Sequence, residues 1–366
     1  MISSSSGFTS RVLRTPAELR EIAMEWTDLW DRCLTATTFQ RPEWLLPWIE
    51  IFSPQEILAI EVRLQTRLVG FAPLLIYPKD GERVLALMGG GVSDYLDLLA
   101  DPRWQTEIVE CVLQNATDDA GWTTLDLTDL PSTSVLLRTP HPAIHVREHD
   151  TCSALALPQT RDELLHLFSK RQRSNLRNAR SRLLKAGGGQ VEMAIAETLS
   201  EFLDDLFRLH TTRWSVAGQA GVLHDDRVRE FHRATAPALL GRGSLRLYRL
   251  RLQGRTLAII QCFFDRDTVF CYLQGFDPEF AYFSPGTHLM FTVLENAVHL
   301  GMRKFDFLRG IESYKLHWRA QTEPTFRLHS PGGHSKLQQS SSCCLIRAYA
   351  PTLNHPETQL RTLTGC

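Results

Sequence analysis

Long hydrophobic runs are absent from this 366-residue sequence. The longest apolar stretch, residues 68–77, is too short to cross a bilayer and contains Pro73. The first residues, MISSSSG, lack the basic and apolar segments of a secretory signal peptide. From these absences we expect a soluble, cytoplasmic protein without a transmembrane segment.

Cysteine pairs of the CxxC type and an excess of charge of one sign are missing as well. The eight cysteines form no CxxC pair and show no zinc-site spacing, so we expect reduced thiols and no bound metal. Forty Lys and Arg residues face 41 Asp and Glu residues, for a net charge of −1. This balance excludes a protein that coats polyanions broadly. The length predicts two or three globular domains.

Two parts of the chain show the same order of predicted elements: a hairpin, a third strand, a loop, a helix and a last strand. In the first part the strands and the helix are predicted at 57–64, 67–77, 83–89, 104–117 and 122–127. In the second part they are predicted at 244–252, 256–264, 268–276, 286–299 and 304–308. The repeated order indicates a duplicated α/β unit.

Helical periodicity precedes the second sheet at 161–186, 198–216 and 225–240. A Pro- and His-rich stretch, 138–150, is the best candidate for a linker between the halves. Near the end the composition turns to Ser, Gln, Gly and Pro. We therefore expect domains at 1–150 and 151–328, followed by a flexible tail at 329–366.

The first candidate site is the junction before the helix predicted at 286–299. Ser284, Pro285, Gly286 and Thr287 form a loop of small residues that opens onto this helix. Exposed backbone N–H groups and the helix dipole favour an anion at such a point, and a pyrophosphate would fit there. Ordinary helix capping by Ser284 and Pro285 is the alternative interpretation.

The second candidate follows the last predicted strand, where ionisable side chains crowd into 305–317. Ligands of open α/β sheets gather beyond the carboxyl ends of strands. Glu312, Tyr314 and Lys315 offer a base, an acid and a cation that could act on an acyl-transfer oxyanion, and Arg309 lies just before them. A solvated loop with surface ion pairs is the alternative.

The third candidate lies on the helix predicted at 198–216. His210 and Trp214 are four residues apart and share a helix face, with Arg213 beside them. These side chains are candidates for binding a substrate. A buried tryptophan with a hydrogen-bonded histidine is the alternative interpretation of the same pattern.

The fourth candidate is the SDYLD segment of the first half, which follows three consecutive glycines. Asp94, Tyr95 and Asp97 lie on a predicted strand, in which neighbouring side chains point to opposite faces. We list all three as candidates for substrate binding. Turn formation after the glycines is the alternative.

The fifth candidate is a basic helix at residues 170–185. It carries seven cationic side chains and no acidic one. Such a helix could bind a phosphodiester of a nucleic acid or of a nucleotide cofactor. It has no aromatic side chain to stack on bases, which weakens a role in binding single strands. A solvated helix face is the alternative.

Five stretches, in this order, resemble the GNAT-fold acyltransferases of the BioF2-like or CelD-like group, which are related to the FemAB peptidyltransferases. The stretches lie at 157–188, 206–214 (LFRLHTTRW), 245–264, 272–289 and 305–318 (FDFLRGIESYKLHW). The first half is similar only in its layout and its SDYLD segment. The resemblance implies an α/β (α+β) protein of two tandem GNAT-like domains. Each would be a mixed, mostly antiparallel twisted sheet flanked by helices, with the working site mainly in the second domain.

The resemblance also implies how a donor would lie. The thioester of an acyl-CoA, acetyl-CoA for example, would sit between the strands at 268–276 and 304–308. A backbone N–H near Gln274, Gly275 or Phe276 would polarise its carbonyl, and the pyrophosphate would sit on 284–287.

The Tyr314–Lys315 pair resembles the aromatic–lysine pair that FemAB relatives place near the reacting carbonyl. By this resemblance Lys315 would stabilise developing negative charge, and Glu312 would orient or deprotonate the amine. Arg309 and Arg213 would hold an anionic substrate or the cofactor phosphates. No serine or cysteine nucleophile is needed, because an amine can attack the donor directly.

The predicted function is therefore transfer of an acyl group from acyl-CoA to an amine or hydroxyl acceptor, with a small molecule or a cell-envelope saccharide as acceptor. One alternative is FemAB-like transfer from an aminoacyl-tRNA, with the helix at 170–185 contacting the RNA. Another is a non-catalytic GNAT-like binding module. The acyl group, the acceptor and the oligomeric state stay open at this stage.

Overall fold

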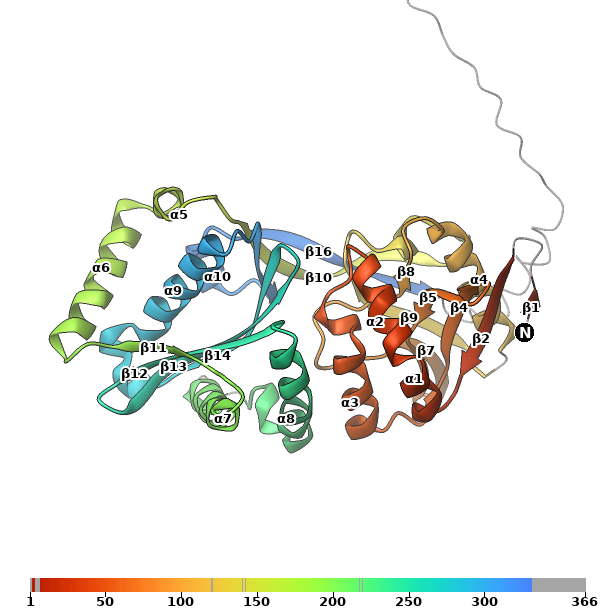
Figure 1. Cartoon of the computed structure of the whole chain (residues 1–366), viewed down its shortest axis with the longest axis horizontal. Coiled ribbons are helices and arrows are strands. Elements are labelled where there is room, and N and C mark those ends of the chain that lie inside the picture. Colours follow the sequence, from red (N-terminus) through yellow and green to blue (C-terminus); the bar gives the residue numbers. More distant parts are fainter. Residues whose placement is uncertain are drawn as a thin grey trace, which may run out of the picture.

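The computed structural model describes residues 2–3, 7–119, 121–139, 141, 143–216, 218 and 220–330 (Figure 1). The first half contains β1 (Ile2–Ser3), β2 (Phe8–Leu13), α1 (Pro16–Glu21), α2 (Ala23–Arg32), η1 (Thr38–Gln40), α3 (Pro42–Phe52), β3 (Glu56–Ile57), β4 (Ala59–Leu64), β5 (Arg67–Ala72), β6 (Leu74–Lys79), β7 (Glu82–Leu87), β8 (Leu99–Ala100), α4 (Gln105–Asp118), β9 (Thr124–Leu130) and η2 (Val135–Leu137).

The second half follows with β10 (His145–Ala156), α5 (Arg161–Leu167), α6 (Lys170–Lys185), β11 (Gln190–Met193), α7 (Leu199–Val216), η3 (Val222–His224), α8 (Asp226–Gly241), β12 (Leu245–Leu252), β13 (Arg255–Asp265), β14 (Thr268–Phe276), η4 (Pro278–Phe283), α9 (Pro285–His299), β15 (Lys304–Arg309), α10 (Ser313–His317) and β16 (Gln321–Ser330).

One 11-stranded sheet passes through both halves, in the order β11-β12-β13-β14-β15-β10-β16-β9-β7-β6-β3. The order is symmetric about its centre, where the long strands β10 and β16 lie side by side (Figure 1). Each half has one parallel pair, β14 with β15 and β7 with β9, whereas the other pairings are antiparallel. The predicted duplication of a mixed, helix-flanked α/β unit is thereby confirmed. A second, 5-stranded sheet, β1-β2-β4-β5-β8, belongs to the first half.

Two predicted elements are divided in the structure. Pro73, which has no backbone N–H to donate, separates β5 from β6, and these strands belong to different sheets. The helix expected over 161–186 is two helices, α5 and α6. The break occurs because Ser169 begins a new helix: its side chain accepts from the backbone of Gln172, whose own side chain accepts from the backbone of Ser169.

The predicted linker and tail are both partly strand. The stretch 138–150 was expected to link the halves, but β10 begins at His145 and pairs with β16 over ten or so residues of its length. The expected domain boundary at residue 150 falls inside this strand. β16 extends to Ser330, two residues into the predicted tail, because His329 and Ser330 pair with β9. Residues 331–366 lie outside the described residues.

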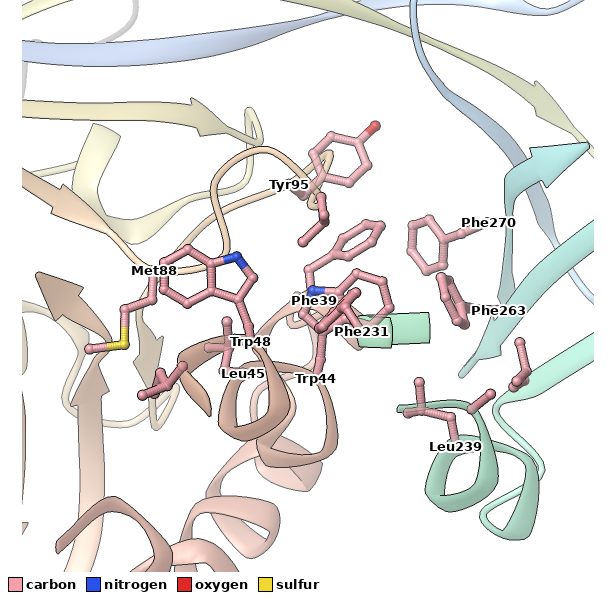
Figure 2. Close-up of a cluster of buried hydrophobic side chains, with 14 of the residues drawn as sticks. Phe39, Trp44, Leu45, Trp48, Met88, Tyr95, Phe231, Leu239, Phe263 and Phe270 are labelled. Atoms are coloured by element: carbon pink, nitrogen blue, oxygen red, sulfur yellow. The ribbon is translucent and has the colours of Figure 1, made fainter. Parts of the chain in front are cut away.

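Aromatic side chains from both halves form one core between them (Figure 2). Trp44 of α3 packs edge-on against Phe231 of α8 and Phe263 of β13, with ring centres 4.6 and 5.4 Å apart. Phe39 of η1 contacts Phe270 of β14 at 6.4 Å. Buried aromatic pairs contribute packing beyond their apolar area. The halves are therefore held in a fixed relation, and side chains of the first half can contribute to a site in the second.

Two further expectations concern cysteines and membranes. Cys33, Cys111, Cys152, Cys262 and Cys271 are free thiols in the structure. The other three cysteines lie outside the described residues. None of the helices formed by the described residues is long and apolar enough to cross a membrane.

Candidate active site

The strands β14 and β15 diverge after a short parallel pairing. Their pairing ends where Phe270 lies opposite Asp306. Beyond that point β14 pairs with β13 as far as Phe276, and β15 pairs with β10 as far as Arg309. The two strands therefore open a wedge in the middle of the sheet.

A β-bulge lies at the start of this wedge. Gln261 of β13 is opposite Leu273, but the next residue, Cys262, is opposite Cys271. Tyr272 is thus an extra residue on β14. A bulge bends its strand and increases the local twist, which is a physical reason for β14 to leave β15 here.

A cleft of about 580 Å³ occupies the wedge. It is lined by β14, β15, α7, η3, α10 and a loop of the first half. The lining brings together nine residues that the sequence nominated: Asp94, His210, Arg213, Trp214, Gln274, Arg309, Glu312, Tyr314 and Lys315. Four separate motifs, from both halves of the chain, therefore meet in one place.

The first half has a corresponding wedge between β7 and β9, and the chain segment that follows β7 fills it. Positive φ angles at Gly89 and Gly91 turn the chain after β7, and a Cβ at Gly89 would lie 2.8 Å from the Ser93 side chain. Leu96 and Leu98 are then buried in the core of the first half, and the Leu96 N–H donates to the Asp129 carbonyl at 3.0 Å. The strand expected over 93–97 is thus wrong, because the turn at the glycines leads into an irregular loop.

Arg309 joins this loop to the cleft. Its guanidinium donates to the Ser93 carbonyl at 2.7 Å and forms ion pairs with Asp94 at 3.3 Å, Asp129 at 3.5 Å and Asp150 at 3.8 Å. One cation therefore faces three carboxylates. Arg309, expected to hold an anionic substrate, is already engaged by acidic groups of the chain.

Asp94 is the carboxylate of this cluster that lines the cleft. Burial raises the pKa of Asp94 to about 6, although the neighbouring Arg309 acts in the opposite direction. A carboxyl with such a pKa is mostly ionised at neutral pH and still accepts a proton readily. It is therefore suited to general base catalysis.

We expect the raised pKa of Asp94 to make the difference in stability between wild type and the Asp94→Asn variant depend on pH. Asp94 binds a proton more readily in the folded protein than in the unfolded chain, so its contribution to stability is full below pH 4 and is lost as the pH rises through about 6. The stability of wild type relative to Asp94→Asn should fall by up to ~3 kcal/mol between pH 4 and 7. Urea unfolding of both proteins at several pH values measures this.

The difference between the two proteins isolates Asp94, because other carboxyls contribute equally to both. Burial also raises the pKa of Asp97, to about 7, and that of Asp306. A stability difference that does not change between pH 4 and 7 would contradict the assignment for Asp94.

Tyr314 also lines the cleft, and its hydroxyl oxygen accepts a hydrogen bond from a neighbouring strand. Gln274 of β14 donates through Nε2 to the Tyr314 hydroxyl oxygen at 2.6 Å. Since the oxygen accepts this bond, its own proton is left to donate elsewhere. The Arg213 guanidinium is 5.7 Å from the centre of the Tyr314 ring, and burial raises the pKa of Tyr314. Tyr314 is therefore a neutral hydrogen-bond donor at physiological pH.

Lys315 is buried, with 2% of its side chain exposed. Its Nζ donates to the carbonyls of Leu308 at 3.1 Å, Arg309, and Gly310 at 3.2 Å, and it forms an ion pair with Glu312 at 2.9 Å. An ammonium has three protons to donate. All of them have partners in the chain segment that leaves β15, so Lys315 fixes the end of this strand.

His210 and Trp214 were nominated for substrate binding; they line the cleft and also form the hydrogen-bonded pair of the alternative interpretation. Trp214 donates through Nε1 to His210 Nε2 at 2.9 Å, so the proton of the neutral imidazole is on Nδ1. Burial lowers the pKa of His210 to about 4, and Arg213 adds to this effect. Among the described residues Nδ1 has no hydrogen-bond partner. The pair closes the α7 side of the cleft as an uncharged wall.

The predicted anion site lies at the start of α9, outside the lining of this cleft. Ser284 adopts a left-handed conformation and its side chain does not cap the helix; it accepts a hydrogen bond from Arg182 of α6 at 2.9 Å. A Cβ at Gly286 would meet Phe276 at 3.8 Å, and the Phe276 ring lies 5.9 Å from the Arg213 guanidinium. Phe276 thus lies between the start of α9 and Arg213, which lines the cleft.

Three nominated residues serve the packing around the cleft instead of lining it. Tyr95 donates to the Asp306 carboxylate at 2.9 Å and borders a separate cavity of about 240 Å³. Asp97 accepts from Ser134 and from the Leu98 N–H, both at 2.8 Å. Gly275 lies against the backbone of α7. Tyr95 and Asp97 lie outside the cleft because an irregular loop, and not the expected strand, carries them. Gly275 lies on β14 but faces α7.

Tyr272 and Asp129 were not nominated from the sequence. Tyr272 lines the cleft and donates to the Val92 carbonyl at 2.7 Å, which fixes the loop that carries Asp94. Asp129 follows the last predicted strand of the first half, as Arg309 follows that of the second half. The repeat itself therefore contained a hint of Asp129, but only the fold shows that the two equivalent positions form an ion pair.

Comparisons with known proteins agree with this architecture. Residues 170–316 match a family described as an acetyltransferase (GNAT) domain. A crystal structure of FemX superimposes with a TM-score of 0.63 at 14% identity, covering 87% of this chain and 98% of FemX. A conserved protein of unknown function from Bacteroides thetaiotaomicron gives a TM-score of 0.56 at 13% identity, covering 86% and 97%. No curated protein matches the chain.

The matched region contains the wedge, α9 and most of the cleft, and the FemX likeness extends over both halves. At this level of identity the likeness concerns the fold. Residues 170–316 thus match a GNAT domain, and the chain as a whole shares its two-part fold with FemX.

Proposed function

We propose that this protein transfers an acyl group from an acyl-CoA, such as acetyl-CoA, to an amine or hydroxyl acceptor, without a covalent enzyme intermediate. The observation that carries the proposal is the cleft between the diverging β14 and β15. The start of α9 is near this cleft, because the Phe276 ring lies between Gly286 and Arg213 of the cleft lining. The GNAT match over 170–316 supports the same class of reaction.

The donor would extend from the start of α9 to the cleft. Its pyrophosphate would accept hydrogen bonds from the first backbone N–H groups of α9, around Gly286 and Thr287, with Arg182 nearby. Its thioester would reach the open edge of β14 near Gln274. There a backbone N–H or the free proton of Tyr314 would stabilise the carbonyl oxygen as negative charge develops.

The acceptor would lie on the side of Asp94. An amine would attack the thioester carbon and form the new C–N bond, while its proton would pass to the Asp94 carboxylate. The C–S bond would break and release the CoA thiolate, which would take up a proton from water. Glu312 is a weaker candidate for this base than the sequence suggested, because it is paired with Lys315 at 2.9 Å. Lys315 would contribute by holding the strand end, and thereby Tyr314, in position.

The aminoacyl-tRNA alternative keeps the same cleft and changes the donor. The likeness to FemX is compatible with it, and no ion pair neutralises the cations of α6 among the described residues. A place in cell-envelope or exopolysaccharide metabolism rests on the BioF2-like or CelD-like resemblance alone. A non-catalytic binding module would bind a ligand in the cleft without turnover.

Binding of acetyl-CoA tests the proposal. We expect acetyl-CoA to raise the melting temperature of the wild-type protein, and the Gly286→Arg variant to lose this shift because the side chain would fill the start of α9. Gly286→Ala is the matched control, since a Cβ there makes only ordinary contact with Phe276 at 3.8 Å. The absence of a shift with any acyl-CoA would contradict the proposed donor.

A further inference from the structure

The exposed side of α6 is strongly basic. Lys170, Arg171, Arg177, Arg180 and Lys185 are exposed, and the helix contains no acidic residue. Within the described residues, none of the α6 cations lies in an ion pair, whereas Arg63, Arg249 and many other arginines of the chain do. The positive charge of α6 is therefore available to a partner.

Exposed apolar side chains cluster in the same part of the chain. Thirteen large hydrophobic side chains of the described residues are exposed, and five of them lie within residues 167–195: Leu167, Leu184, Val191, Met193 and Ile195. Leu184 is 62% exposed and Met193 is 53% exposed. More than a third of the exposed large hydrophobic side chains therefore belong to this one segment.

The cations and the apolar side chains lie on the same side of the sheet. Lys170, Arg177 and Leu184 are spaced seven residues apart, so they form one stripe along α6. The neighbouring face, with Leu176, Ala179 and Leu183, is buried.

The edge strand β11 adds to this surface. Val191 and Met193 pair with Leu250 and Tyr248 of β12, and paired residues of adjacent strands point to the same face of a sheet. Leu250 and Tyr248 belong to the core that α6 and α9 cover. Val191 and Met193 therefore emerge on the α6 side, and Figure 1 shows α6 and the beginning of β11 at the same end of the molecule.

We propose that this surface, the α6 face (Lys170, Arg171, Arg177, Leu184, Lys185 and Val191), docks onto an anionic lipid bilayer. Cations near a bilayer surface are attracted to anionic headgroups, and exposed leucine or valine side chains gain by entering the boundary with the acyl chains. Charge complementarity alone would equally suit RNA. The exposed apolar side chains and the absence of aromatic side chains on α6 favour the lipid.

The face docks by lying on the bilayer and not by crossing it. α6 is only 16 residues long and has buried contacts on its other side. Its Arg182 contacts Ser284 at the start of α9, so a docked molecule would hold the start of α9 close to the lipid surface. The inference does not depend on the proposed acyl transfer, because it concerns a different surface.

Vesicle sedimentation of the full chain tests the proposal. We expect the protein to bind vesicles of phosphatidylcholine with 30% phosphatidylglycerol and not vesicles of phosphatidylcholine alone, with binding weakened as the salt concentration rises. The triple variant Lys170→Gln, Arg177→Gln, Lys185→Gln should bind about 100-fold more weakly, since each cation contributes about fivefold. Leu184→Ser should weaken binding about tenfold while leaving the charge unchanged.

The matched control is the triple variant Arg67→Gln, Lys79→Gln, Arg303→Gln, which removes three exposed cations elsewhere and should bind like wild type. Thermal unfolding verifies that each variant is folded. The proposal is overturned if wild type does not bind the anionic vesicles, or if the α6 triple variant binds them as wild type does. It is also overturned if the α6 face binds a 20-base-pair RNA hairpin more tightly than the vesicles at the same salt concentration.

Discussion

Replacement of Lys315 by methionine should lower the free energy of unfolding by about 3 kcal/mol. The side chain is 2% exposed, and its ammonium donates to the carbonyls of Leu308, Arg309 and Gly310. Methionine fills a similar volume but removes these three hydrogen bonds, at about 1 kcal/mol each, although the Gly310 carbonyl still accepts from Ser153. Urea unfolding of the two proteins at neutral pH measures the difference.

Glu312→Gln is the matched control for this experiment. The Glu312 side chain is 48% exposed, so its ion pair with Lys315 is largely screened by water, and we expect a loss below ~1 kcal/mol. A loss below ~1 kcal/mol for Lys315→Met as well would contradict the structural role. If such a stable variant lost its turnover, Lys315 would act on the reacting carbonyl directly, as its resemblance to FemAB proteins suggested.

Substitution of Gly275 by alanine should cost about 3 kcal/mol of stability. A Cβ at this position would lie 2.5 Å from the backbone nitrogen of His210 and 2.6 Å from the carbonyl carbon of Leu209. Both atoms belong to the backbone of α7, which cannot yield as a flexible side chain can. The helix must therefore move away from β14, with a loss of packing at the upper end of that expected for overpacked cores.

Gly286→Ala provides the comparison for Gly275→Ala. Gly286 lies in the first turn of α9, where a Cβ meets only Phe276 at 3.8 Å, and alanine is a better helix former than glycine. We expect this variant to be as stable as wild type or up to ~1 kcal/mol more stable. Equal stabilities of the two alanine variants, measured by urea unfolding, would show that α7 does not need the close approach at Gly275.

The sequence located most of the candidate site because each motif follows a local rule. Glu312, Tyr314 and Lys315 come just after a predicted strand, and His210 and Trp214 are spaced for one helix face. The cleft contains all five. Tyr95 and Asp97 were misplaced because alternation was assumed along a strand at 93–97, where the chain forms an irregular loop instead.

Contacts between distant parts of the chain could not be obtained from local rules. Arg309 was expected to bind an anion, but Asp129, 180 residues earlier in the sequence, and Asp94 already neutralise it. Gly275 was assigned to cofactor binding from its place in a motif. Its close approach to α7 became visible only once the two elements were packed together.

The sequence by itself determined the repeated order of strands and helices, the GNAT-like character of the second half and the residue types of the cleft. These follow from periodicity, turn residues and short motifs, which act over a few residues. The tertiary structure decided that one sheet joins the halves through β10 and β16 and that the first half closes its own wedge with Leu96 and Leu98. It also decided that the same loop delivers Asp94 to the other wedge, because strand pairing and core packing join residues far apart in the chain.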